Sequence, residues 1–278
     1  MGCPTMEEAV NFSRYRVKAG SAARLAERDP SDTDGLPDGK EARVAKVAEL
    51  AGRLDELQDL FYAEHRHRLL VVLQGMDTSG KDGTIRHVFA EVDPLGVRAV
   101  SFKAPVGEER ERDYLWRIHR QVPGSGEIVI FNRSHYEDVL VTRVHGWIDT
   151  AECERRYDQI NAFERTLADT GTTIVKFFLH ISKEEQRGRL QARLDDPTKR
   201  WKFNPRDLEE RQKWDDYMQA YEDAIAATSH DWAPWYVVPA DSKSARNLLV
   251  SSILIETLQS LDMRYPESAE DYSKLVVT

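Results

Sequence analysis

A glycine-rich segment has the residue types and the spacing of a phosphate-binding loop. Gly75, four further residues and then Gly80-Lys81 reproduce that motif. Glycines let backbone N–H groups curl around an anion, the helix that follows presents its positive end, and the lysine adds a charge. We therefore expect phosphate groups to bind at Gly75, Thr78, Ser79, Gly80, Lys81 and Asp82.

Two carboxylates in this segment depart from the usual motif. The residue after Lys81 is Asp82, where Ser or Thr normally binds magnesium, and Asp77 lies inside the loop. Phosphate oxygens repel a bare carboxylate, but a hard divalent cation bridges the two. We predict that Asp77 is a magnesium ligand and that Asp82 interacts with the dipole of the following helix. In the alternative, Asp77 points outward and caps the helix at Gly80.

A second polar cluster follows the apolar segment 127–131. In open α/β sheets, ligands bind at the carboxyl ends of strands. Asn132 stands where many phosphate-loop proteins have an Asp that orders magnesium, so Glu137 or Asp138 could supply the missing charge. Arg133 has the fork of donors that suits transferring phosphate oxygens. The strand-end candidates are Asn132, Arg133, Ser134, His135, Tyr136, Glu137 and Asp138.

His135 raises the alternative of a covalent phosphohistidine. In-line phosphoryl transfer needs positioning and charge neutralisation rather than a protein nucleophile. A histidine in a polar loop at the end of a strand also commonly serves as a hydrogen-bonding residue. We therefore expect His135 to hydrogen-bond and the transfer to be direct.

A third cluster is a basic arm at about 183–215, after the apolar segment 173–181. Arg189 and Arg193 are four residues apart and share a helix face. Asp195-Asp196-Pro197 ends that helix, and a new one is expected from Asn204-Pro205 through Trp214, Tyr217 and Tyr221. Two helices joined by the basic residues 199–203 favour a lid that closes over phosphates and excludes water. The alternative is a solvated surface hairpin.

A smaller basic group follows the apolar segment 97–102. Lys103 comes at the carboxyl end of that segment, where it could reach the phosphate of an acceptor. Arg117 and Arg120 lie further on, and we interpret them as charges on a helix surface.

The elements that must position these residues follow from hydrophobic patterns. An amphipathic helix is expected from Lys40 to about Arg66. Helical patterns separate five apolar segments, which argues for a parallel five-stranded sheet with helices on both faces, a three-layer α/β fold. Residues 1–40 are polar and rich in turns, so we expect an N-terminal tail followed by one domain at 41–278. The expected strands are Leu69–Leu73, Val97–Phe102, Glu127–Phe131, Thr173–Ile181 and Trp235–Val238.

Composition excludes several classes of protein. No apolar stretch reaches the roughly 18 residues of a membrane helix. The net charge of -9 argues against a general nucleic-acid coat, although it allows a polyanion ligand where basic residues gather. Cys3 and Cys153 are the two cysteines, which excludes a disulfide framework and favours a reducing compartment. Met1-Gly2-Cys3-Pro4 does not resemble a signal peptide, so we expect a cytoplasmic protein.

Several long motifs, in order, resemble the polyphosphate kinase 2 family. They are the segments 74–83 and 131–138, with Trp201-Lys202-Phe203 and Trp214-Asp215-Asp216-Tyr217 in the arm. The resemblance extends from about Lys40 to Asp241. It implies a P-loop kinase fold similar to thymidylate kinase, with a lid. It also implies Mg²⁺, or Mn²⁺ in its place, and phosphoryl transfer between inorganic polyphosphate and AMP, ADP or ATP.

The same resemblance assigns roles to residues. The catalytic positions of the family fall on Asp77, Lys81 and Arg133, with Glu137 assisting as a second metal ligand. Asn132 in place of Asp resembles the subgroup called class III, whose members accept both AMP and ADP. Family members are often dimers or tetramers, so a homo-oligomer is implied. The lid residues that the resemblance implies would grip polyphosphate are Arg187, Arg193, Lys199, Arg200 and Lys202, and we add Arg189 because it shares a helix face with Arg193.

These observations lead to one hypothesis with three rivals. The hypothesis is direct in-line, magnesium-assisted transfer of the terminal phosphoryl group of polyphosphate to AMP or ADP. The nearest rival is an ATP-dependent nucleoside or nucleotide kinase on the same fold. A nucleotide-binding regulatory protein would bind without turnover. A scaffold without ligands leaves Asp77 beside Gly80-Lys81 unexplained.

Overall fold

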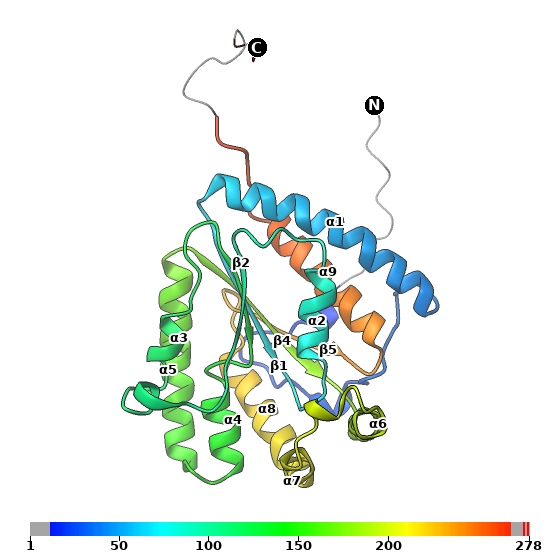
Figure 1. Cartoon of the computed structure of the whole chain (residues 1–278). Coiled ribbons are helices and arrows are strands. Elements are labelled where there is room, and N and C mark those ends of the chain that lie inside the picture. Colours follow the sequence, from blue (N-terminus) through cyan, green and yellow to red (C-terminus); the bar gives the residue numbers. More distant parts are fainter. Residues whose placement is uncertain (1–11, 268–274, 276, 278) are drawn as a thin grey trace.

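Five parallel strands form one sheet in the computed structural model, which describes residues 12–267, 275 and 277 (Figure 1). Their order is β2-β3-β1-β4-β5, so all five carboxyl ends meet at one edge. Each strand lies within one residue of its predicted bounds at both ends, which confirms the predicted sheet. The strands are β1 (Arg68–Gln74), β2 (Val97–Ser101), β3 (Ile128–Asn132), β4 (Thr172–His180) and β5 (Trp235–Pro239).

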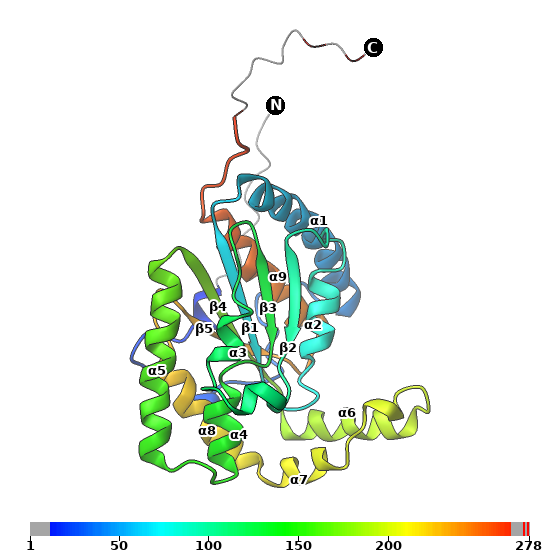
Figure 2. The same ribbon diagram turned by 60° about the vertical axis from the view of Figure 1, so that its left-hand side comes forward.

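Helices cover both faces of the sheet, as predicted. One face carries α1 (Lys40–Glu64), α2 (Lys81–Val88) and α9 (Lys243–Gln259) (Figure 2). The other face carries the remaining sheet-packed helices. These are α3 (Trp116–His119), α4 (Glu137–Val144), α5 (Thr150–Asp169) and α8 (Trp214–Thr228).

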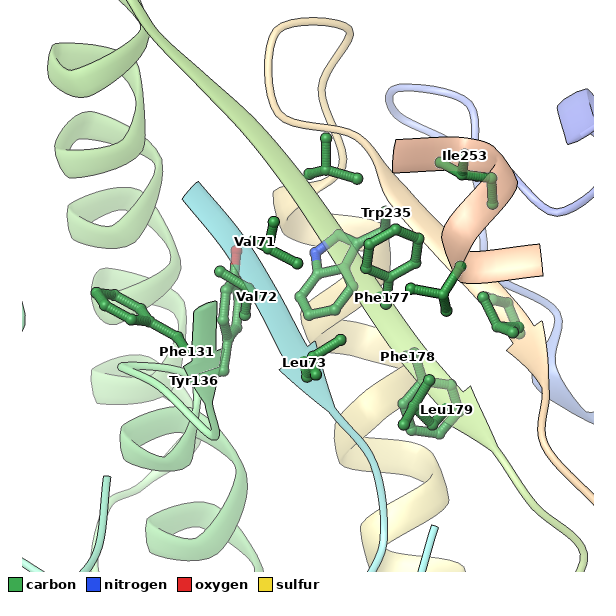
Figure 3. Close-up of a cluster of buried hydrophobic side chains, with 14 of the residues drawn as sticks. Val71, Val72, Leu73, Phe131, Tyr136, Phe177, Phe178, Leu179, Trp235 and Ile253 are labelled. Atoms are coloured by element: carbon green, nitrogen blue, oxygen red, sulfur yellow. The ribbon is translucent and has the colours of Figure 1, made fainter. Parts of the chain in front are cut away.

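The core lies between these layers (Figure 3). Val71 and Val72 on the central strand are fully buried on opposite faces. Tyr136 packs edge-on against Trp235, with 4.9 Å between the ring centroids. Burial of a large apolar side chain contributes about 1.5–3 kcal/mol, so the continuous apolar strands fix the position of the sheet edge where the polar segments begin.

The arm extends beyond the carboxyl edge of the sheet (Figure 2). It contains α6 (Lys183–Asp195), a 3-10 turn (Arg200–Lys202) and α7 (Arg206–Gln212). The prediction of one helix from Asn204-Pro205 through Tyr221 is wrong, because Lys213 leaves helical geometry and separates α7 from α8. The two helices have different surroundings: α7 has no buried residue, whereas α8 buries Trp214 and six others against the domain.

The first described residues are not a free tail. Val17 N–H donates to the Trp235 carbonyl at 2.9 Å, and Val237 N–H donates to the Tyr15 carbonyl at 2.8 Å. Tyr15 and Val17 are buried, as is Leu25 further along. Residues 12–39 therefore form an edge strap that covers the free side of β5, and for them the predicted tail is wrong because their apolar side chains complete the core.

Two expectations concern cysteines and membranes. Cys153 is a free, buried thiol, whereas Cys3 and the rest of the Met1–Pro4 segment lie outside the described residues. Within the described part of the chain, no helix combines the length and the apolar character needed to cross a bilayer.

Candidate functional site

The loop between β1 and α2 has a backbone that only glycine accommodates at two positions. Gly75 and Gly80 have φ of 149° and 106°. A Cβ on Gly75 would stand 2.8 Å from the Leu179 carbonyl oxygen, and one on Gly80 would overlap the Arg246 guanidinium. The loop thus takes a tight curve that a larger residue would disrupt, consistent with the predicted motif.

Two buried hydroxyl groups of this loop have no hydrogen-bond partner among the described residues. They are Thr78 Oγ1 and Ser79 Oγ, and both are shielded from solvent. Buried hydroxyls are normally hydrogen-bonded, so unpaired ones mark a place for a ligand. Their position in the loop agrees with the phosphate site predicted from the sequence.

Lys81 points its ammonium back into the loop. Its Nζ donates to the carbonyls of Gly75 at 2.6 Å and Met76 at 3.2 Å. Burial, followed by the charge of Arg133, lowers the pKa of Lys81 to about 8. An anion in the loop would offset both effects, so the lysine is suited to a phosphate oxygen.

Arg133 lies between the two carboxylates that were predicted to act in catalysis. It donates to Asp77 Oδ1 at 2.5 Å and to Glu137 Oε2 at 3.0 Å. Glu137 makes the largest contribution to raising the pKa of Arg133, and Asp77 adds to it. The arginine has a left-handed φ of 61°. Gly80 starts α2 without any side-chain cap, so the alternative of Asp77 as a helix cap is wrong.

Asp82 and Asn132 contact each other across the same edge. Asn132 Nδ2 donates to Asp82 Oδ1 at 2.5 Å. The usual motif has Ser or Thr after the lysine and Asp at the end of the neighbouring strand. Here Asp82 follows Lys81 and Asn132 ends β3. Asp82 therefore has a specific partner in addition to the helix dipole that the sequence predicted.

His135 is enclosed in a buried polar cluster below Arg133. Its Nε2 is 3.1 Å from Glu164 Oε1, and the other oxygen of Glu164 accepts from Lys176 at 2.5 Å. Tyr136 also donates to Glu164, at 2.9 Å. All four side chains are fully buried. His135 hydrogen-bonds as expected, and its burial argues against a phosphohistidine.

The cations of the arm have two kinds of contact. Arg189 donates to loop carbonyls and is only 9% exposed, so the prediction of a free lid cation is wrong for it. Trp201, at the tip, is 78% exposed. Contacts found within the arm for the other cations are Arg187 with Glu184, Arg193 with Asp207, Lys199 with Asp196, Arg200 with Leu194 and Lys202 with Trp201.

A cavity of about 410 Å³ opens beside the carboxyl end of β2. Arg117 lines it and donates to the Lys103 carbonyl at 2.6 Å. Arg117 is 7% exposed, so its interpretation as a surface charge is wrong, whereas Arg120 is exposed as expected. Burial raises the pKa of Asp138 to about 6, although Arg117 and Arg156 lower it. Lys103 is exposed at this strand end.

Sequence reasoning missed two residues that contact the phosphate loop. Gln186 Nε2 donates to the Asp77 carbonyl at 3.1 Å, and Arg246 donates to the Ser79 carbonyl at 3.1 Å. The three-residue spacing of Gln186 and Arg189 could have placed both on one helix face. Nothing in the sequence links Arg246 to a loop far away along the chain.

Comparisons with known proteins point to one family. The model of "Polyphosphate kinase 2 (PPK2)" matches residues 38–266. An AMP/ADP-polyphosphate phosphotransferase of Meiothermus ruber is 56% identical, over 96% of this chain and 100% of that protein. An ADP-polyphosphate phosphotransferase of Rhodopseudomonas palustris is 44% identical, over 93% of each chain. The crystal structure of Polyphosphate Kinase 2 from Arthrobacter aurescens TC1 is 47% identical, covers 96% of each chain and superimposes with a TM-score of 0.92.

Proposed function

Because the chain belongs to the polyphosphate kinase 2 family, we propose that it transfers the terminal phosphoryl group of inorganic polyphosphate directly to AMP or ADP. The proposal places the donor end in the phosphate loop at β1 and the acceptor at the carboxyl ends of β2 and β3. An oxygen of the acceptor's terminal phosphate attacks the last phosphorus of the chain. The bridging P–O bond breaks, and polyphosphate leaves one unit shorter.

The observation that carries this proposal is the position of Arg133. It contacts both Asp77 and Glu137, at the edge of the sheet where Lys81 and the unpaired loop hydroxyls also lie. A fork of donors at this place neutralises charge that spreads over the transferring phosphoryl oxygens. Lys81 neutralises the same group from within the loop. No protein nucleophile is needed.

Phosphoryl transfer by kinases generally requires a divalent metal. Asp77 and Glu137 face one guanidinium and offer hard carboxylate oxygens, so their chemistry fits Mg²⁺ and also Mn²⁺. We propose that these two residues would hold the ion. When bound, it would supply positive charge that offsets the repulsion between Asp77 and the phosphate groups.

The cavity beside β2 is suited to the acceptor nucleoside. Its volume, about 410 Å³, lies in the range of small-molecule sites. Tyr114 offers an aromatic face, Arg117 and Arg156 offer donors, and Asp138 offers an acceptor. Lys103, at the adjoining strand end, would meet the acceptor phosphate.

The arm at about 183–215 acts as a lid in this proposal. Its cations would grip the rest of the donor chain through Arg187, Arg193, Lys199, Arg200 and Lys202. A row of cations is what a polymer of phosphates requires, and counterion release makes such binding depend on salt. We further propose a cytoplasmic homo-oligomer, either a dimer or a tetramer, in which the edge strap at 12–39 packs as part of the single domain. Light scattering of the purified protein would test the assembly.

The decisive experiment supplies polyphosphate, AMP and Mg²⁺ without ATP, and follows products by ³¹P NMR and nucleotide chromatography. We expect ADP, then ATP, with shortening of the polyphosphate. A parallel reaction contains ATP and AMP without polyphosphate, and the Lys81→Ala variant serves as the inactive control. Transfer from ATP but none from polyphosphate would overturn the proposal in favour of an ATP-dependent kinase. Binding of nucleotide with no transfer from either donor would indicate a regulatory protein.

A further inference from the structure

Three consecutive carbonyls of the phosphate loop are held from behind by side chains. The Asp77 carbonyl accepts from Gln186 at 3.1 Å, and the Thr78 carbonyl accepts from Arg189 at 2.9 Å. The Ser79 carbonyl accepts from both Arg189 and Arg246, each at 3.1 Å. The donors come from α6, at the root of the lid, and from α9.

These bonds fix which groups face the ligand. In a trans peptide, the C=O and the following N–H point in opposite directions. Because the Asp77 and Ser79 carbonyls point toward side chains of α6 and α9, the N–H groups of Thr78 and Gly80 point away from those side chains. Those are the groups that an anion in the loop would meet.

Arg189 has no spare donor for a second ligand. Besides its two loop contacts, it donates to the carbonyls of Ala240 at 2.6 Å and Asp241 at 2.9 Å. Its Nε donates to Glu185 at 2.7 Å. The side chain thus joins α6, the phosphate loop and the segment after β5 at one point.

Arg246 adds a buried charge behind the loop. It is 2% exposed, and its other hydrogen bonds go to Asn247 Oδ1, a neutral acceptor. Burial, with the nearby charge of Arg189, lowers the pKa of Arg246 to about 9. A buried cation without a carboxylate is costly unless an anion lies close by. A phosphate on the other side of the loop would supply that anion, and Gly80 provides the space that the guanidinium needs.

We propose that Gln186, Arg189 and Arg246 are positioning residues that hold the phosphate loop in its anion-binding shape and fasten the root of the lid to it. This inference rests on the proposed function, because it takes a phosphate chain as the loop's ligand. It divides the lid into a root, α6, that is fastened to the phosphate loop, and a tip at 196–205 that has no such bond to the loop among the described residues.

Two variants test the proposal on the full-length protein. Arg189→Lys keeps the charge but cannot reach four carbonyls, and Gln186→Glu removes the donor to Asp77 while keeping the acceptor that Arg211 uses at 2.9 Å. Matched controls are Arg53→Lys, on the exposed side of α1, and Gln191→Glu, on the exposed face of α6. The measurements are the affinity for inorganic triphosphate by calorimetry without nucleotide, kcat with KM for polyphosphate and for AMP, and urea unfolding.

We expect both variants to lose affinity for triphosphate on the order of tenfold, and to lose kcat by at least as much, with KM for AMP unchanged. The controls should match the wild type. Lower unfolding stability with unchanged triphosphate affinity and kcat would reduce these residues to a structural role and overturn the proposal. Should Arg189→Lys not fold, Gln186→Glu decides alone. A wild type that binds triphosphate but shows no transfer would sink the proposed function and leave this inference standing.

Discussion

At the scale of single residues, the sequence predicts the candidate side chains of the site but not how they pair. Asp77, Lys81, Arg133 and Glu137 were all predicted from type and spacing, because each follows a strand or lies in a recognisable loop. The ion pair from Arg133 to Asp77 joins positions 56 residues apart and depends on strand order. For Arg189 the pairing was predicted wrongly. Its charge suggested a bond to phosphate, but its buried guanidinium donates to backbone carbonyls instead.

The first prediction at this scale concerns the two loop residues that would touch the phosphoryl group. Lys81→Ala and Asp77→Asn should each lower kcat by on the order of 10²–10⁴, since each removes charge that stabilises the transition state. Steady-state rates with saturating polyphosphate and AMP would measure the loss. Arg53→Ala, on the exposed part of α1, is the control that should keep full activity. Near-normal turnover in either loop variant would contradict the assigned roles.

His135→Ala is expected to affect stability more than catalysis. The variant leaves Glu164 buried with one partner fewer, which costs about 1–3 kcal/mol of unfolding free energy. Urea unfolding would measure this cost, while kcat of the folded variant should stay within a few-fold of wild type. If turnover vanished in a variant that remained folded, direct transfer would be wrong and a phosphohistidine would return as the explanation.

The pH dependence of stability offers a test of the Asp138 environment. Burial raises the pKa of Asp138 from 3.8 to about 6, so the folded protein holds that proton more tightly than the unfolded chain does. This tighter proton binding stabilises the folded protein fully below the pKa that Asp138 has in the unfolded chain. The stabilisation is lost as the pH rises through about 6, the pKa of Asp138 in the folded protein. Asp138→Asn should remove this dependence, so wild type and variant should diverge by up to about 3 kcal/mol between pH 4 and pH 7. If the difference in unfolding free energy between wild type and variant were the same at pH 4 and pH 7, the result would contradict a buried Asp138 carboxyl.

At the scale of elements, the strands were predictable to within a residue because they are continuous apolar runs bounded by polar segments. The break between α7 and α8 was not predictable, because helical periodicity continues through Lys213. It arises from tertiary contacts: Lys213 Nζ lies 3.0 Å from His145 Nδ1, while the same ring contacts Glu210 at 3.0 Å. These bonds hold the end of α7, where the lid rejoins the domain, against the end of α4.

The tip of the lid should show its function through salt. Replacing Lys199 and Lys202 together by Gln removes two exposed cations, so the logarithm of KM for polyphosphate should depend less steeply on that of salt, by about 0.7–1 per cation. KM measured from low to moderate NaCl would give the slopes. Arg53→Gln should leave the slope unchanged. An unaltered slope in the double variant would place the donor chain elsewhere.

At the scale of the whole molecule, an acidic protein brings Lys81 and Arg133 together at one edge of its sheet. The net charge of -9 argued against a general nucleic-acid coat and left room for an anion where basic residues gather. Strand order β2-β3-β1-β4-β5 brings the loop after β1 next to the polar ends of β3 and β4. Alternation of strands and helices predicted the layers. The sites behind the loop could not be predicted, because Arg246 reaches it only through the packing of α9.

The pairing of Tyr15 and Val17 with β5 has a consequence for how the polypeptide is made. Val17 and Trp235 lie 218 residues apart in sequence, so the early segment emerges from the ribosome long before its partner strand exists. The apolar side chains of this segment therefore stay exposed to solvent until β5 has been translated. Pairing of the edge strap with β5 is therefore a late event in biosynthesis, and contacts of such long range slow folding.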